Sequence, residues 1–218
     1  HTHMHWDILR LWHEIKQALV KTRLQGHLAI QSIGIDTWAV DFGLLGRNGE
    51  LLGNPYHYRD EQTLGMLEEI SQFIPRSELF ARTGIQFMPI NIIYQLYALK
   101  KAGSPLLEQA SSLLMIPELL RYFLTGEQHS EWTVASTTQL CNPYTRDWDR
   151  TLIEQLGLPT HIFLPPEEPG TPVGMLLPSV CAEVGIASIP VIAVAEHDTA
   201  SAVIAVPAGQ EDFAYLSC

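Results

Sequence analysis

The chain has 218 residues, of which 46% are hydrophobic, and a formal net charge of −11 at pH 7. This length suits one large domain or two small ones with a substantial core, and the acidic excess disfavours a nucleic-acid partner, because binding to phosphates needs Lys and Arg. We expect neither a membrane span nor a signal peptide, because no apolar run reaches roughly 18 residues and the first residues lack a basic region followed by an apolar one. The scattered cysteines fit neither a disulfide scaffold nor a zinc site, so we expect a cytoplasmic protein that handles a small molecule.

The first part of the chain is expected to hold one helix followed by strands. Apolar residues at the 3.6-residue period predict an amphipathic helix over residues 7–22. Apolar runs then predict strands over 27–36 and 39–45. Asn48-Gly49 is a strong hairpin signal, because both central residues of that turn need positive φ, and it predicts a return into a third short strand.

The middle of the chain, residues 54–126, has a helical pattern. Its clearest helix spans 90–101, and a short apolar run predicts a buried strand over 113–116. Residues 132–140 predict a further helix. Prolines stand where helices could begin and glycines where they could end, namely Pro75, Pro89, Pro105, Pro117, Gly84, Gly103 and Gly126.

The last part of the chain alternates between strand and helix patterns. The proline-rich residues 161–172 predict a long loop, followed by a helix over 179–184, a strand around Val191, a helix from Thr199 and a strand from Phe213. Strands interleaved with helices indicate an α/β fold. The last strand has nothing after it to pair with and the first helix has no strand before it, so we interpret the chain as a piece of a larger protein.

Asp198 is the first candidate for catalysis. A buried strand that runs into Glu196-His197-Asp198 would place a carboxylate and an imidazole where a helix begins. Ligands of open α/β sheets bind outside the carboxyl ends of the strands, so Asp198 is a candidate general base. The alternative is that Asp198 is the N-cap of the helix, and the two roles are compatible. His197 on its own also suits a packed, hydrogen-bonded histidine.

The second candidate is the segment Asp36-Thr37-Trp38, which places a carboxylate, a hydroxyl and an indole together. The face of a Trp ring suits the apolar side of a sugar, and polar neighbours suit its hydroxyls. The alternative is that Trp38 belongs to the core, with Asp36 and Asp41 at a turn or an edge.

Other patterns are weaker. His1, His3 and His5 alternate as metal ligands on a strand would, but a frayed terminus explains them as well. Asp147 and Asp149 suit a solvated loop. We expect no metal site, and the sequence has neither a phosphate loop nor the G-x-S-x-G of serine hydrolases.

Several collinear segments together resemble the FGGY carbohydrate kinases, and within that family the branch that phosphorylates L-rhamnulose. The segments are 32–42 (SIGIDTWAVDF), 58–60 (YRD), 83–87 (TGIQF), 94–96 (YQL), 114–117 (LMIP), 124–126 (LTG), 135–140 (ASTTQL), 197–203 (HDTASAV) and 214–217 (AYLS). They run through nearly the whole chain in one order, which is more specific than any single motif.

The resemblance implies an actin-like, ribonuclease-H-like ATPase fold, in which the sugar lies in a cleft between two α/β domains. It also implies that Asp198 is the catalytic base in phosphoryl transfer from MgATP to the C1 hydroxyl of L-rhamnulose. The residues implied at the sugar are Trp38, Ala39, Val40, His197 and Thr199. Ala39 stands where the family usually carries Gly, which leaves the sugar open: a kinase for another ketose, such as L-fuculose, and a sugar-binding module without catalysis are the alternatives.

Domain boundaries follow from the same resemblance. Residues 1–212 correspond to the sugar-binding domain without its first strands, and 213–218 to the start of the nucleotide-binding domain. The family's Asp-x-Gly-x-x-Ser phosphate hairpin is absent from the sequence, so we expect ATP and Mg²⁺ to bind mainly outside this chain. We therefore expect no kinase activity from the chain alone. The oligomeric state stays open.

Overall fold

The computed structural model describes residues 3–27, 29–209 and 212–216. The helices are α1 (Ile8–Leu24), α2 (Met66–Ile70), α3 (Arg76–Thr83), α4 (Ile92–Lys101), α5 (Pro105–Gln109), α6 (Ile116–Thr125), α7 (Trp132–Ser136), α8 (Arg150–Gln155), α9 (Pro178–Val184) and α10 (Asp198–Ile204), with 3₁₀ turns at Glu61–Thr63 and Thr160–Ile162. The strands are β1 (Phe42–Leu45), β2 (Ser112–Met115), β3 (Ser130–Glu131), β4 (Cys141–Asn142), β5 (Asp147–Trp148), β6 (Pro166–Glu167), β7 (Thr171–Met175) and β8 (Pro190–Ala193).

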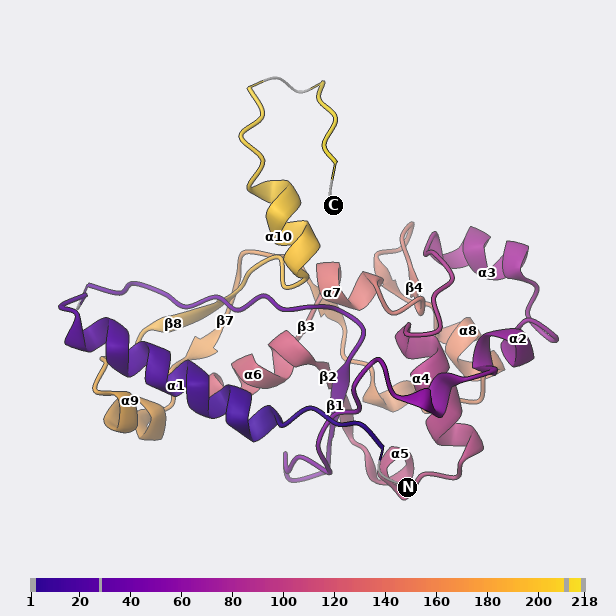
Figure 1. Cartoon of the computed structure of the whole chain (residues 1–218), viewed down its shortest axis with the longest axis horizontal. Helices are drawn as coiled ribbons and strands as arrows, with labels where there is room; N and C mark the ends of the chain where they lie inside the picture. The colour runs from indigo at the N-terminus through magenta and orange to yellow at the C-terminus, as the bar shows by residue number, and fades with distance from the viewer. Residues whose placement is uncertain (1–2, 28, 210–211, 217–218) are drawn as a thin grey trace.

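The strands pair in twos. β1 pairs antiparallel with β2, and β7 antiparallel with β8, whereas β3 and β6 pair in parallel. In Figure 1 the β1–β2 pair lies between two groups: α1, α6, α9, β7 and β8 on one side, and the helices α2 to α5 with α8 on the other. α10 projects from the body just beyond the carboxyl end of β8.

The strand predicted over residues 27–36 is wrong in extent. This segment meets β8 in one isolated parallel bridge, Ile33 with Val191. The next bridge, Thr37 with His197, lies beyond the ends of both the predicted strand and β8. The Ile33 N–H donates to Pro190 O over 3.1 Å, and the Ile192 N–H donates to Ile33 O over 2.8 Å. Both bonds belong to the one bridge that ties this segment to β8, so the continuous ladder that defines a strand is missing.

The second predicted strand begins later than residue 39. Val40 has a φ of 70°, which turns the chain out of the extended conformation, so that β1 starts at Phe42. The chain does turn at Asn48-Gly49, where the Gly46 N–H donates to Glu50 O over 2.8 Å and the Gly49 N–H donates to Gly46 O over 3.0 Å. The expected turn with two positive φ angles is only partly confirmed, because Gly49 has a φ of 79° whereas Asn48 is not among the described residues with positive φ. The chain then returns to β1 through one bridge at Leu51 instead of a third strand.

The helices predicted for the middle of the chain are largely confirmed. Gly84 and Gly126 adopt the left-handed conformation directly after α3 and α6, where helices commonly end on glycine. The helix predicted over 132–140 is shorter, because α7 ends at Ser136 and Gln139 has a φ of 64°. The loop predicted over 161–172 was wrong in part, since it contains β6, which finds a distant partner in β3.

The strand predicted from Phe213 is not present in the described residues 212–216. Phe213, Tyr215 and Leu216 are at least half exposed, and the structure shows no segment paired with them within its described ranges. A strand needs a partner for its backbone groups, which this stretch lacks there. Residues 217 and 218 lie outside the described residues.

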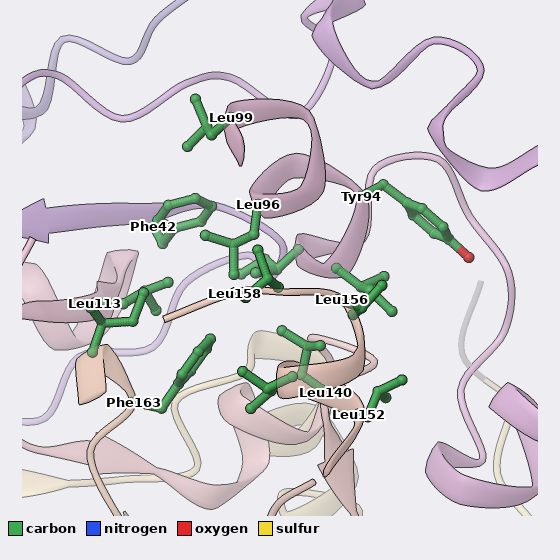
Figure 2. Packing of buried hydrophobic residues seen from close by; sticks show 14 of the residues in the cluster. Phe42, Tyr94, Leu96, Leu99, Leu113, Leu140, Leu152, Leu156, Leu158 and Phe163 are labelled. Carbon is green, nitrogen blue, oxygen red and sulfur yellow. The ribbon is translucent and has the colours of Figure 1, made fainter. Parts of the chain in front are cut away.

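The main core cluster joins β1 and β2 to α4 and α8. Figure 2 shows Phe42, Leu96, Leu113, Leu152 and Phe163 converging in it. Burial of such a side chain contributes about 1.5–3 kcal/mol. A second cluster packs β7 and β8 against α9 and α1. This packing anchors β8, whose carboxyl end carries the candidate site.

Candidate functional site

The two segments singled out in the sequence lie side by side. The Thr37 N–H donates to Glu196 O over 3.1 Å, and the Asp198 N–H donates to Thr37 O over 2.9 Å. These bonds form a parallel bridge between Thr37 and His197. The turn after Thr37 and the start of α10 are thereby joined at the carboxyl end of β8, where ligands of α/β sheets commonly bind.

Asp198 is the first residue of α10 and not its N-cap, which corrects one interpretation of the sequence. The N-cap is His197, which makes no side-chain cap bond. The Asp198 carboxylate accepts from the Thr199 N–H (2.6 Å) and the Thr199 hydroxyl (3.2 Å) through the same oxygen, Oδ1. The side chain of Asp198 is 56% exposed, so the carboxylate is accessible to a ligand.

The His197 imidazole lies beside Asp198, with Nε2 3.5 Å from Asp198 Oδ1. Burial lowers the pKa of His197 below its usual 6.5, although the charges of Asp198 and Glu131 act in the opposite direction. His197 is therefore neutral at pH 7, and one ring nitrogen can accept a hydrogen bond while the other donates one.

The turn formed by Trp38, Ala39 and Val40 has a strained backbone. Val40 is buried, and its φ of 70° is unusual for a β-branched residue. Trp38 and Ala39 are half-buried, and the Thr37 hydroxyl donates to Trp38 O over 2.9 Å. Strained backbone of this kind clusters at ligand sites.

Asp41 follows this turn, directly before β1, and is fully buried. The sequence suggested a turn or edge position for Asp41 but did not predict its burial. Its Oδ2 accepts from the indole N–H groups of Trp6 (2.6 Å) and Trp38 (3.0 Å). Burial raises the pKa of Asp41, and hydrogen bonds from Trp6, Trp38 and Gln95 oppose that rise. Sequence reasoning missed Trp6 and Gln95, because no local pattern connects positions 6, 41 and 95.

A buried ionic cluster lies beneath the residues that precede α10. Arg121 and Glu196 form a fully buried ion pair, and the Arg121 guanidinium also donates to His129 O over 2.8 Å. Glu196 Oε2 and Arg121 Nε have no hydrogen-bond partner among the described residues. Burial raises the pKa of Glu196 well above its ordinary value, and the charge of Arg121 opposes this.

Glu131 connects this cluster to the residues before α10. Its carboxylate accepts from the Glu196 N–H (3.2 Å) and from the Thr133 hydroxyl (2.6 Å). Thr133 Oγ1 in turn accepts from the His197 N–H (3.3 Å). Glu118 accepts from the Glu131 N–H (2.7 Å), and burial raises the pKa of Glu118 to about 7. Nothing in the local sequence separated these glutamates from solvated ones.

Comparison with known proteins identifies the family. Residues 1–205 match the FGGY family of carbohydrate kinases, N-terminal domain. The chain belongs to this family. The resemblance seen in the sequence motifs is therefore confirmed.

Curated relatives within this FGGY family carry the name rhamnulokinase. One from Oceanobacillus iheyensis is 45% identical over 212 residues, which are 97% of this chain and 44% of the relative. One from Bacteroides thetaiotaomicron is 45% identical over 215 residues, 99% of this chain and 44% of the relative. The chain thus spans less than half the length of these relatives.

Solved structures of FGGY-type kinases share the fold. A xylulose kinase from Rhodospirillum rubrum has a TM-score of 0.84 at 16% identity, covering 94% of this chain and 43% of that one. A glycerol kinase from Plasmodium falciparum, crystallised with ADP, has a TM-score of 0.80 at 18% identity, covering 92% of this chain and 41% of that one. The actin-like, ribonuclease-H-like α/β fold expected from the motifs is confirmed.

The described part of this FGGY domain holds no group of three or more His, Cys, Asp and Glu side chains arranged for a metal ion. His3 instead contacts Asp60 (3.0 Å), and His5 packs on Tyr56, while His1 lies outside the described residues. Asp149 caps α8 and pairs with Arg82. In the same residues no helix has the length and apolar character to cross a membrane.

Proposed function

We propose that this chain is the sugar-binding part of a kinase that transfers the γ-phosphoryl group of MgATP to the C1 hydroxyl of L-rhamnulose. The observation that carries the proposal is the backbone pairing of Thr37 with His197, which brings the Trp38 turn beside the exposed Asp198 carboxylate. The names of the curated relatives support the choice of sugar.

Asp198 acts as the general base. It takes the proton of the C1 hydroxyl while that oxygen bonds to the γ-phosphorus and the bond from phosphorus to the β,γ-bridging oxygen breaks, which releases ADP. A positioned base contributes typically about 10²–10⁴-fold. The larger part of the acceleration in phosphoryl transfer comes from alignment and charge neutralisation, so the geometry around Asp198 matters as much as its proton affinity.

The remaining predicted site residues hold the sugar. The half-buried Trp38 ring offers an apolar face, and the neutral His197 imidazole and the Thr199 hydroxyl offer hydrogen bonds to sugar hydroxyls. Ala39 and Val40 bring their backbone to the same region. The methyl group of Ala39 narrows the space beside Trp38 relative to glycine, which makes Ala39 a determinant of ketose choice.

We assign MgATP binding to residues outside this chain, with residues 213–218 leading toward the nucleotide domain. Mg²⁺ would enter on the ATP phosphates and supply charge neutralisation there. We keep the cytoplasm as the proposed compartment, because three scattered cysteines are not the framework of a secreted disulfide-rich domain.

A ketose panel tests the proposal. The assay uses the two-domain kinase, meaning this chain within a polypeptide that also carries a nucleotide domain, with MgATP and L-rhamnulose, L-fuculose or D-xylulose. We expect ADP release to be fastest with L-rhamnulose and the product to carry phosphate at C1. Preference for L-fuculose would transfer the assignment to that ketose, and sugar binding without ADP release would favour a non-catalytic sugar module.

A further inference from the structure

The Asp41 carboxylate holds two indole rings at once. Both the Trp6 and the Trp38 N–H groups donate to Asp41 Oδ2, over 2.6 Å and 3.0 Å. The two rings contact each other at a tilt of 34° with their centroids 4.3 Å apart, and the His57 ring stacks on Trp6 with its centroid 4.3 Å away. Because Trp6 contacts both Trp38 and His57 and its N–H is bound to Asp41, we assign it a supporting role for Trp38 and not a direct contact with the sugar.

Gln95 grips the same turn from α4. The two N–H groups of its side-chain amide are shared among three acceptors: Asp41 Oδ1 (3.3 Å), Ile90 O (3.0 Å) and the carbonyl oxygen of Val40. Gln95 is buried among the core residues of α4, so the amide cannot swing into solvent. The Val40 backbone is therefore held on its carbonyl side by α4 and on its next residue by the two indoles.

These contacts explain how Val40 keeps an unfavourable conformation. A β-branched residue at a φ of 70° persists only where its surroundings over-determine it. Asp41 is adjacent to Val40 and is fixed by the side chain of Trp38 from the same turn and by those of Trp6 and Gln95 from distant parts of the chain. Without them the turn would relax toward the extended conformation of β1.

The identity of residue 41 is also informative. Burial raises the pKa of the Asp41 carboxyl, and no Lys or Arg in the described residues forms a salt bridge with it. A carboxylate is an acceptor only, and every partner of Asp41 is a donor. An asparagine at position 41 would replace one of the two carboxylate oxygens by an NH2 group. That NH2 group would then face an N–H donor of Trp6, Trp38 or Gln95 instead of accepting from it.

We propose that Asp41 is a positioning residue of the sugar site, which holds the Trp38 ring and the Val40 backbone in place for the ketose through Trp6 and Gln95. The proposal rests on the function proposed above. Asp41 does not touch the sugar, since it is fully buried. It acts by presenting the turn to Asp198.

The test measures steady-state kinetics of the two-domain kinase with Asp41→Asn and with Trp6→Phe. We expect the ketose KM to rise about tenfold in Asp41→Asn, as the loss of one hydrogen bond to a charged group would produce. Trp6→Phe keeps an aromatic ring against Trp38 but loses the N–H donor, so its ketose KM should rise less than that of Asp41→Asn. A third variant, Trp6→Ala, also removes the ring, so its ketose KM should rise more than that of Trp6→Phe. The KM for MgATP should stay unchanged in all three variants.

Trp12→Phe is the matched control, because Trp12 lies on α1 beside Phe123, and its ketose KM should equal that of the unaltered kinase. An unchanged ketose KM in a folded Asp41→Asn variant, or equal rises for ketose and MgATP, would overturn the inference. If thermal unfolding shows that Asp41→Asn does not fold, the test uses Trp6→Phe instead. An unchanged ketose KM in that variant, or equal rises for ketose and MgATP, would overturn the inference. An unaltered kinase that phosphorylates no ketose would instead overturn the proposed function, and the inference with it.

Discussion

Asp198 and Thr37 are joined by a backbone hydrogen bond of 2.9 Å, from the Asp198 N–H to the Thr37 carbonyl oxygen. The bond connects the first residue of α10 to the residue before the Trp38 turn, across 161 positions of sequence. A displacement of either Thr37 or Asp198 therefore alters the distance between the proposed base, Asp198, and the Trp38 turn that is proposed to bind the sugar.

Asp198→Asn removes the proposed base and keeps the size of the side chain. We expect kcat of the two-domain kinase to fall by about 10²–10⁴-fold, with the ketose KM little changed, because the asparagine oxygen still accepts from Thr199. Steady-state kinetics with L-rhamnulose measure both constants. Asp147→Asn, on β5, is the control, and near-normal turnover of Asp198→Asn would exclude Asp198 as the base.

Ala39→Gly removes the methyl group beside Trp38. If this methyl crowds the ketose, kcat/KM for L-rhamnulose should rise by up to about tenfold, the lower end of what one such group contributes in a pocket. The ratio of kcat/KM for L-rhamnulose to that for L-fuculose is the quantity to measure. An unaltered ratio would show that Ala39 does not determine the choice of ketose.

Arg121→Met leaves the buried Glu196 carboxylate without its counter-charge. Removal of one partner from a buried ion pair costs about 3–5 kcal/mol, so the urea midpoint of the chain should fall substantially at pH 8. Because burial raises the pKa of Glu196, protonation of this carboxyl should restore part of the lost stability as the pH is lowered. The double variant Arg121→Met/Glu196→Gln should lose less stability than Arg121→Met alone, and an equal loss would contradict the role of the charge.

Glu118 predicts a pH dependence of stability. Its pKa is raised from 4.5 to about 7 by burial, so between these values the folded state binds more protons than the unfolded state. The free energy of unfolding should then fall as pH rises through this window, by at most about 1.4 kcal/mol per pH unit for one group. His197, with its lowered pKa, has the opposite effect below pH 6.5.

The difference between the unaltered chain and Glu118→Gln isolates this contribution. Urea unfolding at pH 5, 6, 7 and 8 should give a flatter dependence for the variant, because glutamine does not titrate. Identical slopes for both proteins would show that Glu118 has an ordinary pKa in the folded chain.

Local patterns in the sequence determined much of the fold. The amphipathic period predicted α1, and Gly84 and Gly126 predicted the ends of α3 and α6, because each depends on interactions within a few residues. The Asn48-Gly49 turn follows from the same local geometry. The strand run into Glu196-His197-Asp198 also placed Asp198 correctly at the carboxyl end of β8.

Only the tertiary structure decided which of these segments meet. The segment before Trp38 is a set of isolated bridges and not a strand, because its hydrogen bonds depend on where β8 lies. The clamp of Trp6, Asp41 and Gln95 and the cluster of Arg121, Glu131 and Glu196 join residues far apart in sequence, and a side chain's type does not reveal its partner. Burial also decides what a carboxylate does. An aspartate at the surface is a solvated charge, whereas the buried Asp41 is a fixed hydrogen-bond acceptor that holds a strained turn.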